Sequence, residues 1–279
     1  MNEVLSEARA TSVLPLDAKS GSAFLRVEGL CLEFPIYHGG ARSLKRTMMS
    51  AASGRLGPAR ASVGGEAQAT SNRVVVQALR EVSFSLRAGD RLGIVGHNGA
   101  GKSTLLRAMA GIYEPVAGRV HASGSLHALL DPGSGLNLDL TGRENIVLRG
   151  RYKGMDAAAI RRLEDDVQEF AALGEFIELP VRTYSSGMVV RLAFGLATAI
   201  APQILLMDEW FMAGDAAFRD KAHARLENVV RGAEILVLTS HMLPVLKSWC
   251  NRVLWLESGR IRADGAPEQI LPAYLGALG

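Results

Sequence analysis

The sequence predicts an α/β fold whose core is a parallel sheet covered by helices on both faces. Two runs, residues 204–207 and 235–239, are apolar along their whole length, and a helical pattern spans most of residues 216–230 between them. Continuous apolar strands separated by helices are typical of a parallel sheet that is buried on both faces. The chain of 279 residues is long enough for one large core, or for a core with a small satellite subdomain.

The N-terminal part predicts β structure ahead of this core. Residues 1–22 are small and polar with little periodicity, so we expect a flexible tail. Residues 24–34 alternate as a strand does, and the runs VVVQAL and VSFSL resume the pattern before a turn at residues 87–90. The stretch 38–72 is rich in Gly, Ala, Ser and Arg, which indicates an insertion or a long loop. We therefore expect an N-terminal antiparallel β subdomain.

A phosphate-binding pattern follows at the start of the core. A short apolar strand over residues 91–95 leads into a glycine-rich loop and a helical run, TLLRAMA, that can end at Gly111. The loop satisfies G-x-x-x-x-G-K-[ST], in which backbone N–H groups wrap a phosphate chain. We expect Lys102 to reach the outer phosphates and the hydroxyl of Ser103 to bind Mg²⁺. This motif predicts a P-loop NTPase fold with a RecA-like core. The residues expected to bind nucleotide here are Gly96, Asn98, Gly99, Gly101, Lys102, Ser103 and Thr104.

The middle of the chain predicts an inserted helical subdomain over residues 133–187. Asp156 can cap a helix that Gly174 ends, and a further helix begins at Ser185 or Ser186 and runs to Pro202. After the second core strand, the C-terminal sequence RVLWLESGRIRADG predicts a hairpin with its turn at residues 257–259, followed by a short helix.

Two adjacent carboxylates, Asp208 and Glu209, end the apolar strand at residues 204–207. In open α/β sheets ligands bind outside the carboxyl ends of the strands, which is the edge where the phosphate loop is also expected. Asp208 can then hold Mg²⁺, directly or through its water shell, and Glu209 can act as the general base toward an attacking water. We expect Glu209, with Lys102, to be catalytic, and ATP and Mg²⁺ to be the cofactors.

Bulk composition excludes some classes of partner. The net charge is only +3, which gives no support for a nucleic-acid partner. The two cysteines, Cys31 and Cys250, have no metal-binding or redox spacing, so we expect reduced, packing thiols. No apolar stretch approaches the roughly 18 residues of a membrane span, so another chain would have to hold the protein at a membrane.

The segment Tyr184-Ser185-Ser186-Gly187-Met188, at a helix start upstream of the acidic strand, resembles the signature motif of ABC ATPases. Ser185 and Gly187 match the commonest form of that motif, whereas Tyr184, Ser186 and Met188 depart from it. The resemblance implies one ABC ATPase domain over residues 23–275. It also implies that Ser185 and Gly187 close over the ATP of a second copy, which makes a head-to-tail homodimer.

Further site residues follow from the same resemblance. His241, after the second core strand, matches the switch histidine that contacts the γ-phosphate, and Asp215 falls where the family has an aspartate at the dimer contact. Two positions stay open. Asp131 is the nearest polar candidate for the Mg²⁺-binding glutamine that this sequence lacks, and either Phe34 or Tyr37 can stack on adenine.

A further set of less specific motifs resembles one branch of the family, the ATP-binding subunits that export capsular polysaccharide, O-antigen or teichoic acid. These motifs are YSSGM, DEWF, GDAAF, EFPIY and the loop DPGSGLNLDLTGRENI. The resemblance implies a peripheral protein at the cytoplasmic face of the inner (plasma) membrane, with an integral membrane permease as partner and a polysaccharide as indirect substrate. An exporter of lipids or drugs, or a regulatory dimer that binds ATP without transport, are the alternatives.

Overall fold

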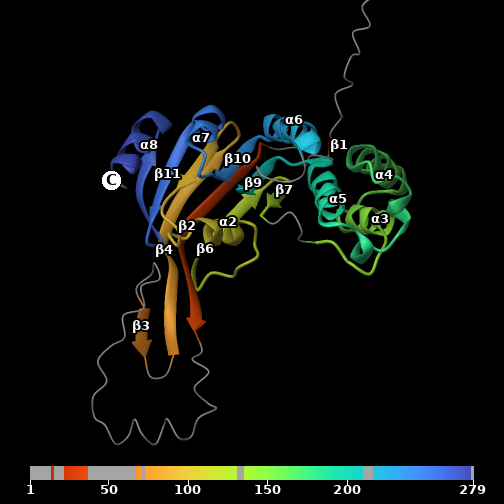
Figure 1. The fold of residues 1–279 in the computed structure, drawn as a ribbon. Coiled ribbons are helices and arrows are strands. Elements are labelled where there is room, and N and C mark those ends of the chain that lie inside the picture. The colour runs from red at the N-terminus through yellow and green to blue at the C-terminus, as the bar shows by residue number, and fades with distance from the viewer. Residues whose placement is uncertain are drawn as a thin grey trace, which may run out of the picture. The chain divides into compact units, whose positions relative to one another are not determined.

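The computed structural model describes residues 14–15, 22–36, 67–70, 73–130, 135–209 and 216–277. These residues form two compact units (Figure 1). The first unit comprises Met1–Phe24, Arg87–Arg91 and Ala122–Leu238, and the second unit comprises Leu25–Leu86, Leu92–His121 and Thr239–Gly279. Each unit therefore combines segments that are far apart in the sequence.

The second unit contains a sheet with the strand order β3-β4-β2-β6. The strands are β2 (Phe24–Ile36), β3 (Ala67–Thr70), β4 (Arg73–Arg87) and β6 (Ala117–Ser123). β3 runs antiparallel to β4. Alternate residues of β2, including Leu25 and Val27, are buried, which is the period expected of a sheet with one face on a core.

The same unit carries the strand and helix of the predicted phosphate-binding pattern. β5 (Arg91–Val95) pairs in parallel with β11 (Arg252–Glu257), and β11 pairs antiparallel with β12 (Arg260–Gly265). Helix α2 (Lys102–Met109) follows β5, while α7 (Leu243–Trp249) and α8 (Pro267–Gly276) belong to the C-terminal segment. A Cβ on Gly93 would lie 2.9 Å from a methyl carbon of Leu246, so the glycine lets α7 pack closely on β5.

The first unit contains three neighbouring strands, in the order β10, β9 and β7. They are β7 (Leu126–Leu129), β9 (Ile204–Asp208) and β10 (Ile235–Thr239), and β7 runs parallel to β9. The apolar residues of β9 and β10 are fully buried, as the continuous apolar runs predict. Helix α6 (Ala216–Gly232) connects β9 to β10.

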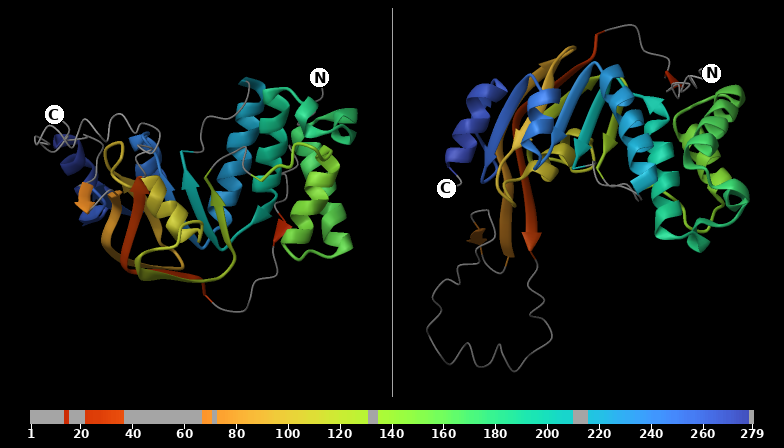
Figure 2. Two further views of the ribbon diagram at one scale, coloured as in Figure 1. Left: turned by 90° about the horizontal axis from the view of Figure 1, so that it is seen from below. Right: turned by 45° about the horizontal axis from the view of Figure 1, so that its top comes forward.

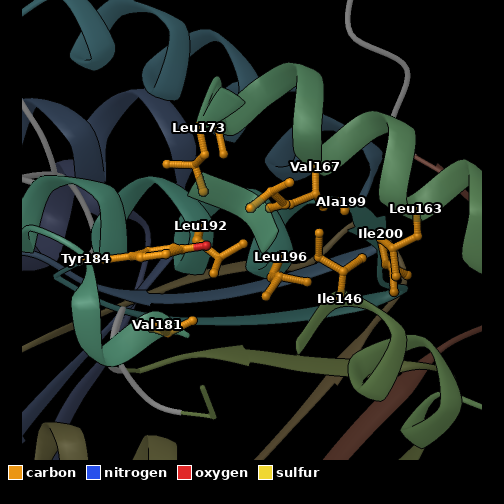
Figure 3. Packing of buried hydrophobic residues seen from close by; sticks show 12 residues of the cluster. Ile146, Leu163, Val167, Leu173, Val181, Tyr184, Leu192, Leu196, Ala199 and Ile200 are labelled. Atoms are coloured by element: carbon orange, nitrogen blue, oxygen red, sulfur yellow. The ribbon is translucent and has the colours of Figure 1, made fainter. Parts of the chain in front are cut away.

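Helices α3 (Gly142–Tyr152), α4 (Ala157–Ala171) and α5 (Ser186–Thr198) pack against one another in the first unit (Figure 2). Two short 3-10 helices, η2 (Gly174–Glu178) and η3 (Val181–Thr183), join α4 to α5. The side chains of these helices meet in one apolar cluster (Figure 3). The labelled members of the cluster are Ile146, Leu163, Val167, Leu173, Val181, Tyr184, Leu192, Leu196, Ala199 and Ile200.

Most predicted elements are confirmed, and two predicted helix ends are wrong. α4 ends at Ala171 with Ala172 in the left-handed conformation (φ 49°), so Gly174 instead begins η2. α5 ends at Thr198 and does not reach Pro202, because the next residues form β8 (Ile200–Ala201) and pair in parallel with β1 (Leu14–Pro15). The helical conformation is disfavoured for the residue that precedes a proline, which is consistent with a helix that ends before Pro202.

Within the described ranges, no helix is both long and apolar enough to cross a membrane. The predicted boundaries at residues 1–22, 38–72 and 133–187 stay predictions. Most of the first two stretches lies outside the described residues.

Candidate nucleotide-binding site

The phosphate loop joins β5 to α2 in the second unit and depends on glycine at two close approaches. Gly96 has φ 156°, and a Cβ there would overlap the carbonyl oxygen of Leu256. Gly101 has φ 105°, and its Cβ would lie 2.8 Å from the carbonyl oxygen of Ala78. The glycines of the motif are therefore required by the packing of this unit as well as by any bound phosphate.

Helix α2 begins directly at the loop with an N-terminus suited to an anion. Its N-cap is Gly101, which offers no side-chain acceptor to the first amides, and the first helical bond runs from the N–H of Leu105 to the carbonyl of Gly101 at 2.8 Å. The amides of Lys102, Ser103 and Thr104 precede that bond, so they and the helix dipole favour a negative group at this end.

The ammonium of Lys102 lies over its own loop. Its Nζ donates to the carbonyl oxygens of Gly96 and His97, at 2.8 and 3.2 Å. A terminal phosphate entering the loop would offer charged acceptors to the same ammonium, and charge-assisted hydrogen bonds are stronger than those to neutral carbonyls. The ammonium of Lys102 therefore already lies where the motif predicts the outer phosphates.

The turn between β11 and β12 holds the phosphate loop through backbone hydrogen bonds. The N–H of Gly259 donates to the carbonyl of Ala100 at 3.0 Å, and the carbonyl of Gly259 accepts from the N–H of Arg80 at 2.8 Å. Gly259 has φ 78°, and a Cβ there would lie 2.6 Å from the carbonyl oxygen of Ala78. This contact ties the predicted hairpin turn to β4 and to the phosphate loop.

A pocket of about 150 Å³ brings three predicted site residues, Gly96, Lys102 and His241, together in the second unit. Gly96 and Lys102 line it with Ser240 and His241, and Tyr274 of α8 forms part of its wall. His241 is exposed, while Ser240 is buried and its Oγ accepts from the N–H of Met242 at 3.0 Å. The structure thus places the imidazole expected to contact a γ-phosphate beside the lysine expected to bind it.

The two predicted carboxylates lie in the first unit, at the end of β9. Asp208 is half-buried and ends the strand, whereas Glu209 is exposed and has φ 53°. Backbone in this region is unusual for a residue other than glycine and costs about 1–3 kcal/mol. The chain therefore turns at Glu209, directly after β9 ends.

The predicted signature segment forms the N-terminus of α5 in the first unit. Ser185 is its N-cap, and its Oγ accepts from the N–H of Met188 at 3.3 Å. Ser185, Ser186 and Gly187 are exposed. A Cβ on Gly187 would come no closer than 4.0 Å to any atom, so the fold of this chain does not require glycine there.

Tyr184 is a residue whose role sequence reasoning missed. It is buried in the apolar cluster, and its hydroxyl donates to the carbonyl of Phe176 at 2.6 Å (Figure 3). Burial raises the pKa of this phenol. Tyr184 precedes the N-cap, and Val189 packs on the same cluster from the N4 position, which is the spacing of a hydrophobic staple. This spacing is visible in the sequence and could have predicted that Tyr184 is buried.

Several predicted residues lie outside the described part of the chain. These are Asp131, Asp215 and Tyr37. Of the two aromatic candidates for adenine, Phe34 packs edge-on against Tyr113, with ring centroids 5.2 Å apart. The choice between Phe34 and Tyr37 stays open. Asn98 is exposed, and Ser103 and Thr104 are half-buried at the start of α2.

Comparison with known proteins identifies the family of this chain. The family described as ABC transporter matches residues 79–212. The O-antigen export system ATP-binding protein RfbE of Yersinia enterocolitica is 41% identical over 235 residues, which cover 84% of this chain and 94% of that protein. The teichoic acids export ATP-binding protein TagH of Lactococcus lactis is 39% identical over 197 residues, which cover 71% of this chain and 42% of that protein.

Among solved structures, an ATP-binding subunit of an ABC transporter superposes with a TM-score of 0.63 at 21% identity, covering 90% of this chain and 93% of that one. A dimeric ATP-binding cassette in a post-hydrolysis state with ADP and phosphate gives 0.60 at 18% identity, covering 87% and 98%. These likenesses confirm the predicted P-loop NTPase fold. Taken with the sequence relatives, they show that the chain belongs to the ABC transporter family and is one of its ATPase domains.

Proposed function

We propose that this chain is the ATP-hydrolysing subunit of an exporter that drives a cell-surface polysaccharide across the cytoplasmic membrane. The observation that carries the proposal is the pocket shared by Lys102 and His241 next to the N-terminus of α2. Such a pocket suits the terminal phosphates of ATP, since cationic, imidazole and backbone N–H donors converge on it. The relatives supply the kind of cargo, because their names place them in O-antigen and teichoic acid export systems.

In this proposal Ser103 and Asp208 would each offer an oxygen donor to Mg²⁺. Magnesium in nucleotide sites is usually held by one or two protein oxygens together with phosphate oxygens, and a hydroxyl at the start of α2 and a carboxylate at a strand end fit that pattern. The ion would neutralise charge on the phosphates when bound. Lys102 would hold the outer phosphates, and the other residues of the loop would cradle the chain with their amides.

Glu209 is the residue that we propose as general base. Glu209 is exposed and follows β9 in the left-handed backbone conformation. A water placed between this carboxylate and the γ-phosphate would be oriented and deprotonated by it, while His241 would hold the phosphate oxygens. The backbone strain at Glu209 is of the kind that functional sites retain.

A second copy of the chain would complete each site. Ser185 and Gly187 are exposed at a helix N-terminus, and glycine at 187 has no packing reason within one copy. Close approach of a phosphate to the α5 N-terminus would supply that reason. In the proposed dimer these residues contact the ATP held by the other copy, and Asp215 lies at the contact between copies.

Closure of the dimer on two ATP would drive the permease, because ATP binds the closed dimer better than the open pair. The chain would act as a peripheral subunit at the cytoplasmic face, held by an integral membrane permease that contacts the polysaccharide.

The test compares the wild type with Glu209→Gln. We expect Mg²⁺-dependent hydrolysis by the wild type, a loss of about 10²–10⁴-fold in the variant, and accumulation of an ATP-bound dimer of that variant in light scattering. Glu175→Gln, which changes an exposed carboxylate of η2, is the matched control and should hydrolyse normally. ATP binding without turnover by the wild type, even in membranes that hold its partner, would leave only a regulatory dimer.

A further inference from the structure

Helix α8 ends at the nucleotide pocket of the second unit, and its last turn forms part of the pocket wall. The residues of α8 that are not exposed share one face of the helix, since they are spaced i, i+3, i+4 and i+7. They are Pro267, Ile270, Leu271 and Tyr274. The first three are buried, and α8 packs on β11. Tyr274 continues the same face, is half-buried, and lines the pocket. The packing of α8 therefore brings a tyrosine to the site of the predicted outer phosphates.

Aromatic packing fixes the ring of Tyr274. The ring meets the indole of Trp255 edge-on, with ring centroids 5.5 Å apart and an interplanar angle of 75°. Trp255 is buried, and the guanidinium of Arg262 lies over its ring at 4.1 Å from the centroid. Arg262 in turn donates to Oε1 of Glu257 at 2.6 Å. Trp255 lies beside Val95, the last residue of β5 before the phosphate loop. The tyrosine is therefore anchored to the strand next to the one that carries the loop.

The phenol of Tyr274 is the group of α8 that suits a phosphate. The C-terminus of a helix presents carbonyl oxygens and the negative end of the helix dipole, so its backbone offers nothing to an anion. Two residues of α8 line the pocket, and of these Leu275 has an apolar side chain whereas Tyr274 has a hydroxyl donor. A neutral hydroxyl can donate to a phosphate oxygen without adding charge to a pocket that already contains Lys102 and His241.

We propose that the hydroxyl of Tyr274 donates a hydrogen bond to an oxygen of the γ-phosphate of ATP, which makes Tyr274 a further catalytic residue beside Lys102 and His241. Trp255 is a positioning residue, because it holds the ring that carries the hydroxyl. The inference rests on the proposed function in that ATP is hydrolysed at this pocket. The contact matters most in the transition state, where the γ-phosphoryl group must stay in line with the attacking water while charge spreads over its oxygens.

The variant Tyr274→Phe tests the hydroxyl alone, since it keeps the ring and its contact with Trp255. For the purified protein we expect kcat of Mg²⁺-dependent ATP hydrolysis to fall at least about tenfold, while KM for ATP changes by less than about twofold. The melting temperature should stay at the wild-type value. Tyr152→Phe is the matched control, because it removes the hydroxyl of an exposed tyrosine of α3, and it should hydrolyse ATP at the wild-type rate.

Inhibition by vanadate gives a second measure of the phosphate contact. ADP with vanadate mimics the phosphoryl group in transfer, so the vanadate concentration that halves the rate should rise at least about tenfold in Tyr274→Phe. Binding of a fluorescent ATP analogue should change by less than about twofold, because the amides of the phosphate loop and Lys102 hold the ground state. Equal losses of vanadate inhibition and of ATP binding would mean that Tyr274 only maintains the shape of the pocket, and they would overturn the proposal.

A double-mutant cycle tests the role of Trp255. Trp255→Phe reduces the surface against which the Tyr274 ring packs, so it should lower kcat in the wild-type background. It should have little further effect in Tyr274→Phe, because the hydroxyl that Trp255 positions is already absent. Equal losses of kcat in the two backgrounds would show that Trp255 does not act through this hydroxyl, and the positioning role would be wrong.

The contrary outcomes separate this inference from the proposed function. If the wild type and Tyr274→Phe hydrolyse ATP equally well, the tyrosine contact is wrong and the proposed function stands. If adding Tyr274→Phe to Glu209→Gln weakens the ATP-bound dimer in light scattering, while Tyr274→Phe alone keeps the wild-type response to vanadate, the hydroxyl contacts the second copy and not the phosphate. If the wild type shows no turnover, the proposed function fails and this inference fails with it.

Discussion

The buried ion pair between Arg225 of α6 and Asp166 of α4 should be the most sensitive electrostatic contact of the first unit. The Arg225 side chain is 1% exposed and that of Asp166 is 10% exposed. Two nitrogens of Arg225 donate to the two carboxylate oxygens, and its Nε donates to Oγ1 of Thr198 in α5 at 2.9 Å. The guanidinium also lies over the ring of Phe170, at 4.4 Å from its centroid. One side chain therefore joins α4, α5 and α6.

The loss of unfolding free energy depends on which charged group a substitution leaves buried without a partner. Arg225→Met keeps apolar contact with Phe170 but leaves the Asp166 carboxylate buried without its partner, which costs about 3–5 kcal/mol of unfolding free energy. The double variant Arg225→Met with Asp166→Leu removes the stranded charge as well. It should return to within about 1 kcal/mol of the wild type or exceed it, because apolar replacement of a whole buried pair is often neutral or stabilising.

Urea unfolding followed by circular dichroism measures these differences. Arg231→Met is the control on the same helix, because Arg231 is exposed and, among the described residues, pairs with Glu227 at the surface. It should change the free energy of unfolding by no more than about 0.5 kcal/mol. A single variant Arg225→Met that costs less than about 1 kcal/mol, or a double variant as unstable as the single one, would refute the reasoning.

Three further predictions follow from the described contacts. Since burial lowers the folded-state pKa of His127 from 6.5 to about 3, the unfolded chain takes up a proton below pH 6.5 that the folded chain excludes. Unfolding free energy should therefore fall by about 2 kcal/mol between pH 6.5 and 4.5, and urea titrations of His127→Gln should lack that part of the fall. Gly96→Ala should weaken binding of a fluorescent ATP analogue at least about tenfold, because its Cβ has no space, whereas Gly232→Ala, with open space, should not. Tyr184→Phe should lower the unfolding free energy by about 0.5–1.5 kcal/mol in urea titrations, because it removes one hydrogen bond to the Phe176 carbonyl, which keeps the N–H of Leu179 as its other donor.

Features that depend on a few neighbouring residues were predictable from the sequence. The phosphate loop, the Asp156 N-cap and the Ser185 helix start all appear where their local patterns predict them, and Gly111 follows α2 with φ 72°. Each depends on a preference that acts within about one helical turn. The end of α5 was not predictable in the same way, because β8 exists only through pairing with β1, a segment far away in sequence.

The basic side chains of α3 show why part of the structure could not be predicted. In the sequence, Arg149 and Lys153 are two cations on a polar helix, a pattern that usually means a solvated face. Their surroundings become clear only when β7 brings His127 against Arg149 and both cations are half-buried. A pattern of residue types records which charges a helix carries, but the cost of a charge depends on which distant groups exclude water from it. The energetic cost of these charges is therefore visible only in the folded chain.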